Sequence, residues 1–232
     1  VSHSFDVGND GLIAELADAI FDEEGRVDVL LAATGEPTVA PLEALAMADW
    51  RRTLDKNLWP AVATVMGFAP RMAAQRPIAA GPLVGRRGAV VLVGSAVGLA
   101  ALPYAAPFVS AQHALVGLGE ALAMELGSKG LQVLTACPGP TQGSGVVAAR
   151  GSLPGAWGAR LATLYGGWAL RPEVTARRIV SALRQNRTLL APRLGAAELF
   201  GLRRLLGRRY ADLVRRWVAY LDHRDMMSGA RR

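Results

Sequence analysis

The chain has 232 residues, of which 51% are apolar and 19% charged, and it contains a single cysteine, Cys137. This composition excludes a disordered tail protein and a disulfide scaffold, and the length suits one compact domain with a large core. The net charge of +7 is uneven, because residues 171–232 carry 15 arginines against 5 acidic residues. The apolar runs are too short for a membrane span and the first residues lack the features of a signal peptide, so we expect a cytoplasmic protein.

Apolar periodicity predicts helices and strands in alternation along the first half of the chain. Residues 10–24 repeat apolar side chains at the spacing of an amphipathic helix, and residues 27–33 follow as an apolar strand. A second helical stretch covers 42–72 and is split near Asp49 and Pro60. A loop rich in proline and glycine follows at 77–88.

The same alternation continues in the second half. Further elements are predicted as a strand at 89–93, a helix at 108–128, a strand at 131–137 and a helix at 172–186. Apolar strands that alternate with helices predict a doubly wound α/β domain, in which helices cover both faces of a parallel sheet. We assign this domain to residues 1–190, with a lid loop at about 141–170, and a basic helical extension to residues 191–232.

Four short motifs occur in a particular order along these elements. They are the strand and turn at 27–35, Asp55-Lys56-Asn57-Leu58, the segment 91–98 that contains Ser95, and Pro138-Gly139. Their order and spacing resemble the short-chain dehydrogenase/reductase family from the first residues to about Arg187. The resemblance implies a Rossmann-like fold and hydride transfer between a nicotinamide cofactor and a carbonyl group.

The resemblance also implies a catalytic tyrosine and a lysine four residues later, which share one face of a helix so that the cation lowers the phenol pKa. Counted from Ser95, those two positions are Phe108 and Gln112. Phenylalanine has no ionisable proton and glutamine has no charge. Asn57 and Ser95 remain as the other catalytic positions of the family pattern.

The cofactor implied by the resemblance is NAD(P), which would lie against Asp6, Gly35, Pro138 and Gly139. The Gly-rich turn that holds the pyrophosphate in this family does not occur before the first motif, which argues against nucleotide binding. The string at 143–148 has the glycine spacing of such a turn but lies in the lid loop, so we interpret it as flexible loop. No cluster of histidine, cysteine and carboxylate residues has metal-ligand spacing.

Without the two strands that open the family's sheet, the strand at 27–33 becomes an exposed apolar edge. The segment 2–7 resembles the family's third strand and would lack a neighbour. Because the chain begins with Val1 rather than methionine, we expect upstream residues in the native protein to supply the absent elements. The alternative is a partner that covers this edge.

Three single residues have competing interpretations. Tyr104 could be a displaced catalytic acid, but Pro103 and Pro107 predict a loop there and favour a pocket-lining role. His113 is interpreted as a hydrogen-bonded or surface histidine, and Cys137 as a small core residue rather than a nucleophile.

Two surfaces suggest partners. The resemblance implies an oligomer, with this chain or with a related subunit, through the helices around Asn57 and 108–126. A stripe of apolar residues at 198–221, flanked by arginine pairs, is interpreted as a helix packed on the domain or on a partner. The alternative and more specific interpretation is docking on a membrane surface. No nucleic-acid partner is predicted.

Three functional hypotheses follow. The first is a redox-inactive subunit that supports or regulates an active relative. The second is an enzyme of changed chemistry, such as cyclisation, dehydration or isomerisation, that uses Ser95, Asn57 or Tyr104 to orient its ligand. The third is an NAD(P)-dependent oxidoreductase whose N-terminal cofactor-binding part is missing from this chain.

Overall fold

The computed structural model describes residues 10–143, 169–192, 209, 212 and 216. These residues include a parallel sheet with the strand order β1-β2-β3-β4. The strands are β1 (Val29–Ala32), β2 (Gly88–Val93), β3 (Leu131–Ala136) and β4 (Leu189–Leu190). The first three confirm the predicted strands. A strand of two residues such as β4 is too short to produce a recognisable apolar pattern.

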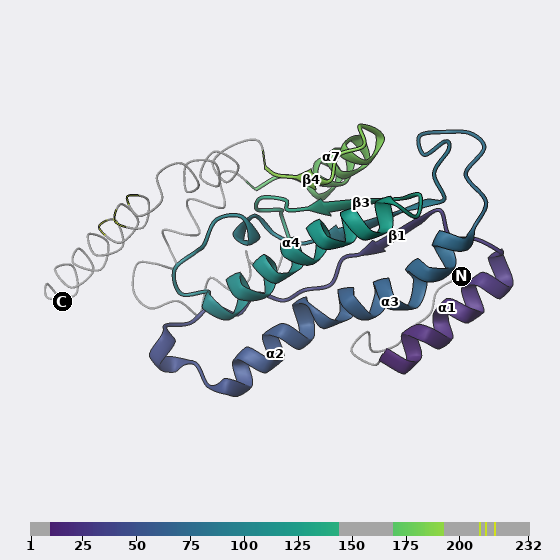
Figure 1. Cartoon of the computed structure of the whole chain (residues 1–232). Coiled ribbons are helices and arrows are strands. Elements are labelled where there is room, and N and C mark those ends of the chain that lie inside the picture. The colour runs from purple at the N-terminus through teal and green to yellow at the C-terminus, as the bar shows by residue number, and fades with distance from the viewer. Residues whose placement is uncertain (1–9, 144–168, 193–208, 210–211, 213–215, 217–232) are drawn as a thin grey trace, which may run out of the picture.

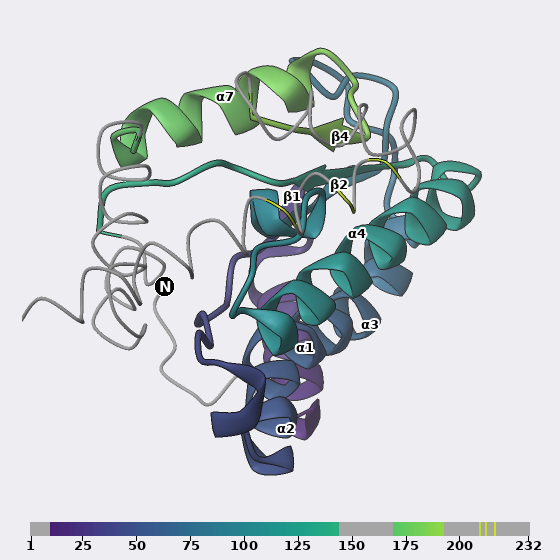
Figure 2. The same ribbon diagram turned by 90° about the vertical axis from the view of Figure 1, so that its left-hand side faces the viewer.

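Helices cover both faces of the sheet, as expected for a doubly wound α/β fold. The helices are α1 (Asp10–Glu24), α2 (Met47–Asn57), α3 (Trp59–Ala74), α4 (Ala106–Gly127) and α7 (Pro172–Arg184), with short 3-10 turns η1 (Leu42–Ala44) and η2 (Ala96–Gly98). Figure 1 shows α1 to α4 below the sheet and α7 above it, and Figure 2 shows the strands between these two layers.

The helical stretch predicted at 42–72 is interrupted twice, as expected. The first interruption separates η1 from α2, and Asp49 lies in the first turn of α2, where its Oδ2 accepts the Ala46 N–H at 2.9 Å. That hydrogen bond holds the pKa of the Asp49 carboxyl below its usual value. The second interruption is at Leu58, and Pro60 lies in the first turn of α3, where a missing N–H costs nothing.

The main core lies below the sheet. Leu30, Val90 and Val133 form one row across β1, β2 and β3, and they pack with apolar side chains of α1, α3 and α4. The helix α4 approaches β3 so closely at Gly119 that a Cβ atom there would lie 1.8 Å from Thr135 Oγ1. Glycine is therefore required at position 119 by packing rather than by backbone conformation.

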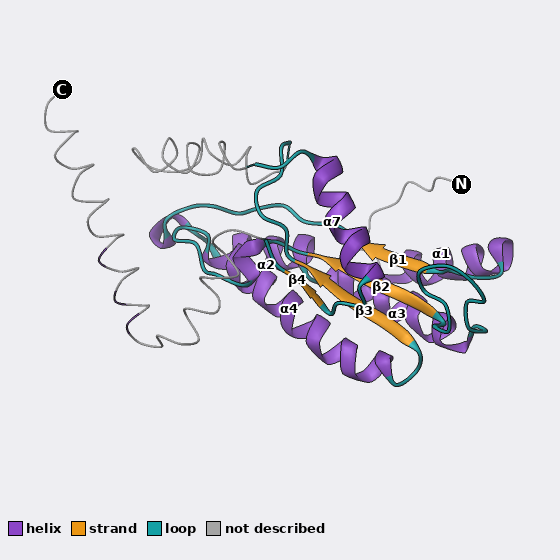
Figure 3. Cartoon of the chain, turned by 90° about the horizontal axis from the view of Figure 1, so that it is seen from above, coloured by secondary structure: helices purple, strands orange, loops and turns teal. Residues whose placement is uncertain are grey.

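The upper face is covered unevenly. Leu31, Val91 and Leu134 form the corresponding row there, but Val91 and Leu134 are buried beneath α7 whereas Leu31 is 52% exposed. Seen from above, α7 lies over only part of the sheet (Figure 3). Among the described residues β1 pairs with β2 alone. The predicted exposed apolar edge at 27–33 is confirmed for this part of the chain.

Several predicted segments lie outside the described residues. They are the strand-like segment 2–7 with Asp6, most of the lid loop, and nearly all of the extension at 191–232. The two ends of the lid loop are described and lie together, because Leu170 N donates to Pro140 O at 2.9 Å and Thr141 bridges to Leu170. The boundary proposed near residue 190 stays a prediction.

Candidate functional site

The candidate site lies at the carboxyl ends of the parallel strands, where open α/β sheets bind their ligands. The chain leaves β1 at Gly35, leaves β2 at Gly94 and Ser95, and leaves β3 at Pro138 and Gly139. Ala96 N donates to Pro138 O at 2.9 Å and so joins the second loop to the third. Four of the residues predicted from the motifs therefore meet at one edge of the sheet.

Asn57, the last residue of α2, is buried and holds the loop after β1. Its Nδ2 donates to Thr53 O at 2.8 Å and to Glu36 O at 2.9 Å, while its Oδ1 accepts Glu36 N at 3.2 Å. A Cβ atom on Gly35 would lie 2.7 Å from Asn57 Oδ1. Glycine at position 35 thus permits the loop to close on the Asn57 carboxamide. Gly35 and Asn57 therefore both have a structural role in this loop.

Gln112 contacts Asn57 directly. Its side chain is buried in α4, and Nε2 donates to Asn57 Oδ1 at 3.3 Å. The other oxygen, Gln112 Oε1, is buried without a hydrogen-bond partner in the described part of the chain, and it faces the backbone of Gly94. A neutral carboxamide pair therefore occupies the interior at the position where the family resemblance implies a lysine.

Phe108 lies one turn before Gln112 and on the same side of α4. Its ring is buried in a small apolar cluster with Val97 and Ala105. Partly buried apolar side chains pack against this cluster. The partly buried members are Val39, Leu102 and Val109. The ring is thus a packing element here, and it provides no proton for transfer.

Ser95 and Tyr104 carry two of the hydroxyl groups at this edge. Ser95 precedes η2, and its Oγ accepts Val97 N in a long contact of 3.5 Å. Tyr104 lies in a turn, as its flanking prolines predict, and has φ +62°, which is rare for a bulky side chain. Its carbonyl accepts the Ala40 N–H at 2.7 Å, which ties the loop after β2 to the loop after β1.

The charged groups near this edge are directed outward. Lys56 forms an exposed ion pair with Glu36, and this cation holds the pKa of the Glu36 carboxyl below its ordinary value.

His113 has its Nδ1 3.0 Å from Val109 O, as expected of a hydrogen-bonded histidine. Burial raises the pKa of the Cys137 thiol to about 12, so the thiol is protonated at neutral pH and is a core residue, as predicted.

The family resemblance implies a nicotinamide dinucleotide, but the described residues do not fit this cofactor. The position expected to provide a cation to the cofactor has an uncharged carboxamide, 3% exposed, that faces Asn57 rather than a ligand. Within residues 10–143 and 169–192, no group of three or more histidine, cysteine or carboxylate side chains is placed to hold a metal ion. In the same segments no helix is long and apolar enough to cross a bilayer.

Comparison with curated proteins identifies relatives over part of this chain. It is 28% identical to D-beta-hydroxybutyrate dehydrogenase of Rhizobium meliloti (strain 1021) over 137 residues, which are 59% of this chain and 49% of that protein. It is 31% identical to D-threitol dehydrogenase of Mycolicibacterium smegmatis over 133 residues, which are 57% of this chain and 47% of that protein. The chain thus spans about half the length of these curated relatives.

Solved structures share the fold. A short-chain dehydrogenase from Streptomyces avermitilis superposes with a TM-score of 0.70 at 22% identity, covering 94% of this chain and 79% of that one. A short-chain dehydrogenase from Mycobacterium paratuberculosis, solved bound to NAD, gives 0.67 at 22% identity, covering 85% and 74%. Residues 1–152 match the family described as short chain dehydrogenase. The chain therefore belongs to the short-chain dehydrogenase/reductase family.

Proposed function

We propose that this chain is a subunit of the short-chain dehydrogenase type that does not itself transfer hydride and that supports or regulates an active relative. The observation that carries the proposal is the buried hydrogen bond between Gln112 and Asn57, 3.3 Å long, beside the buried ring of Phe108. Both side chains are packed into the interior as neutral groups.

The chemistry supports this proposal. Reduction of a carbonyl requires a proton donor beside the hydride acceptor, and a phenol with an unperturbed pKa near 10 serves near neutral pH only if a cation favours its ionised form. Position 108 has no acidic proton and position 112 has no charge. Lys56, the cation next to Asn57 in sequence, is exposed and paired with Glu36, so it does not replace the absent ammonium group.

An exposed apolar surface on α3 and α4 supports the pairing. Met66 and Met124 are 71% and 75% exposed, and Trp59, seven residues before Met66 on α3, is also exposed. Ala114 and Gly117 are exposed on the face of α4 that includes Met124, and small residues there would let a partner helix approach closely. A related subunit with the same two helices would cover this surface in a symmetric arrangement.

The test has two parts. We expect the purified protein alone to leave NADPH unoxidised with a panel of aldehydes and ketones, and native mass spectrometry of material from its host to show a second subunit. The Phe108→Tyr/Gln112→Lys variant identifies the reason for inactivity. It should gain activity only if the tyrosine and the lysine are the sole groups that the site lacks. Oxidation of NADPH by the wild-type chain at an ordinary rate would overturn the proposal and favour the oxidoreductase that the relatives' names suggest.

A second candidate is an enzyme of changed chemistry that binds its ligand at Ser95 and Tyr104. The observation that favours it is the left-handed backbone of Tyr104, because bulky residues remain in such conformations mainly where the side chain is needed. In this case Ser95→Ala and Tyr104→Phe should each reduce turnover of a non-redox substrate. Unchanged turnover in both variants would exclude it.

A further inference from the structure

The loop between α3 and β2 is unusual in composition. The nine residues from Pro77 to Gly85 include no polar side chain, and the flanking residues are Arg76 on one side and Arg86 and Arg87 on the other. Figure 1 shows this loop, in blue, extending beyond the amino-terminal end of the sheet. Ser95 follows the opposite, carboxyl end of β2. The loop is therefore separate from the candidate functional site.

The loop is held in place by its own hydrogen bonds. Ile78 N donates to Arg86 O at 2.7 Å and Gly85 N donates to Ile78 O at 2.9 Å, so the two arms are joined at the base. Leu83 is buried and anchors the tip, whereas Val84 is 61% exposed. Ala79, Ala80 and Pro82 are exposed as well. An ordered loop thus presents an apolar tip to solvent, which favours an interaction surface.

Cations surround the base of this loop. The segments that precede parallel strands lie at the same edge of a sheet, and at this edge they carry Arg76, Arg86, Arg87, Lys129, Arg184 and Arg187. A hydrogen bond of 2.7 Å from Arg86 Nη2 to Asn186 Oδ1 places the turn after α7 against the loop. None of these six cations forms an ion pair with another described residue.

The acidic residues at this end of the sheet are placed differently. Asp22, Glu23 and Glu24 belong to the last turn of α1, which leads to the edge strand β1, and Asp28 is paired with Arg26 before that strand. Glu125 is exposed on α4, one turn before Lys129. The six cations therefore lie before the amino-terminal ends of β2, β3 and β4, beside the apolar loop, and Glu125 is an acidic neighbour of Lys129.

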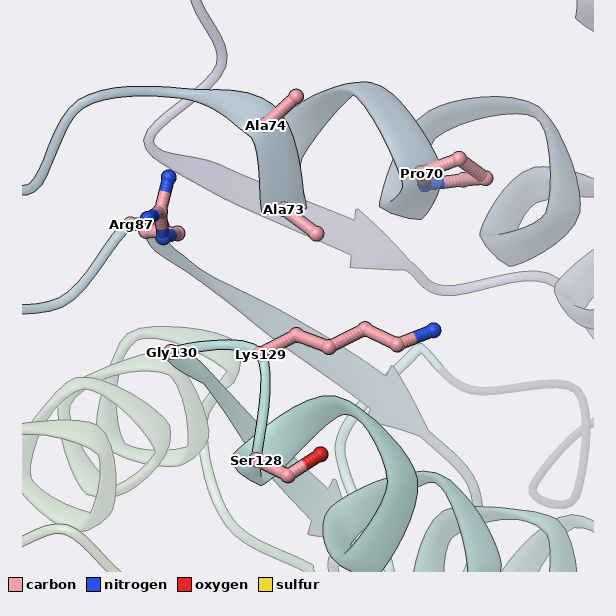
Figure 4. Close-up of a pocket in the computed structure, with 7 residues that line it drawn as sticks. All are labelled: Pro70, Ala73, Ala74, Arg87, Ser128, Lys129 and Gly130. Atoms are coloured by element: carbon pink, nitrogen blue, oxygen red, sulfur yellow. The ribbon is translucent and has the colours of Figure 1, made fainter.

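A hollow of about 630 Å³ lies next to the loop and combines the same two properties. Its lining consists of Pro70, Ala73, Ala74, Arg87, Ser128, Lys129 and Gly130. Figure 4 shows Lys129 extending beneath the α3 residues Ala73 and Pro70, with Arg87 at the other end of the hollow. Two cations beside an apolar wall suit a phosphate group that carries a hydrocarbon substituent.

We propose that the loop 76–87 and the cations around it form a docking surface for an anionic phospholipid bilayer. The tip around Val84 enters the boundary between headgroups and acyl chains, and the cations bind headgroup phosphates, with the hollow between Arg87 and Lys129 as the site for one of them. Apolar insertion and attraction to anionic lipid together give reversible surface binding. A nucleic acid would bind the cations but offers no hydrocarbon layer for the tip.

The test is co-sedimentation of the full chain with vesicles. We expect binding to vesicles that contain phosphatidylglycerol, weaker binding at high salt, and little binding to pure phosphatidylcholine. Arg76→Glu/Lys129→Glu reverses two exposed cations that form no ion pair with another described residue, and should lower the partition coefficient about 30-fold or more. Val84→Asp should lower it at least about 10-fold.

A matched control separates location from net charge. Arg51→Glu/Arg171→Glu changes the net charge by the same amount at exposed positions away from the loop, and should retain most of the binding. The proposal is overturned if the loop variants bind anionic vesicles as the wild type does, or if the wild type binds neither vesicle type. It is also overturned if Arg76→Glu/Lys129→Glu weakens binding to a DNA duplex while Val84→Asp leaves vesicle binding unchanged.

Discussion

Gln112 and Asn57 form a buried carboxamide pair that joins α4 to α2, and the acceptor oxygen of Gln112 is left without a hydrogen-bond partner among the described residues. The two members of the pair are not equivalent. Asn57 satisfies three backbone groups of its surroundings, whereas Gln112 contributes a single long hydrogen bond and buries an oxygen at a cost.

This asymmetry predicts unequal losses of stability. Asn57→Ala removes all three of these hydrogen bonds, two of which hold the part-buried backbone of Glu36, and should lower the free energy of unfolding by about 2–4 kcal/mol. Gln112→Leu removes one hydrogen bond together with the unpaired oxygen, so the free energy should change by less than about 1 kcal/mol. Urea denaturation of both variants measures the difference. Equal losses would mean that Gln112 Oε1 has a partner in solution.

The sequence predicts the fold better than it predicts the site. The strand β2 is apolar at every position and buried on both faces, so one pattern identifies both its structure and its place in the sheet. The alternation of exposed and buried side chains along β1 has no counterpart in the sequence, because Val29 and Leu31 are as apolar as Leu30 and yet are exposed. Their exposure follows from the position of α7, which no local pattern encodes.

For the site, the motifs identify Asn57, Ser95 and the glycine turns as candidate residues. The hydrogen bond between Asn57 and Gln112 could not be predicted, since it joins residues 55 positions apart on two helices. The left-handed backbone of Tyr104 was also missed, because two prolines predict a turn but do not specify its handedness. Long-range packing decides both features.

A second prediction concerns the contact between α4 and β3. Gly119→Ala places a methyl group 1.8 Å from Thr135 Oγ1 and should destabilise the protein by about 1–3 kcal/mol. Gly117→Ala is the matched control on the same helix, since no atom lies within 4 Å of the added methyl, and it should stabilise the protein by about 0.5–1 kcal/mol.

Thermal unfolding of the two variants should therefore move the melting temperature in opposite directions. Thr135→Ala combined with Gly119→Ala removes the colliding hydroxyl group and should restore part of the lost stability. A loss that Thr135→Ala does not reduce would show that another atom of β3 opposes the methyl group.

A third prediction concerns the Cys137 thiol, whose pKa burial raises to about 12. The folded protein should react with a thiol reagent at pH 8 only as fast as it unfolds, while unfolded chain reacts at once. Because the folded pKa lies above the unfolded value, the contribution of this group to stability is complete below about pH 8.5 and is lost as the pH rises toward 12. Labelling followed by mass spectrometry, with and without urea, measures the reaction. Rapid labelling of the folded protein would contradict the burial of this side chain.

The last prediction uses two neighbouring residues of β1 that point to opposite faces. Leu30 is 8% exposed within the main core, whereas Leu31 is 52% exposed on the upper face. Leu30→Lys buries a charge and should prevent stable folding, since an unpaired buried ion costs several kcal/mol. Leu31→Lys should leave the melting temperature within a few degrees of wild type. A lysine on an open strand edge opposes pairing between sheets, so Leu31→Lys should also reduce concentration-dependent association in light scattering. If instead Leu31→Lys unfolds the protein, a covering element lies over β1 in the native assembly, and the exposed face of this strand is a contact surface rather than a free one.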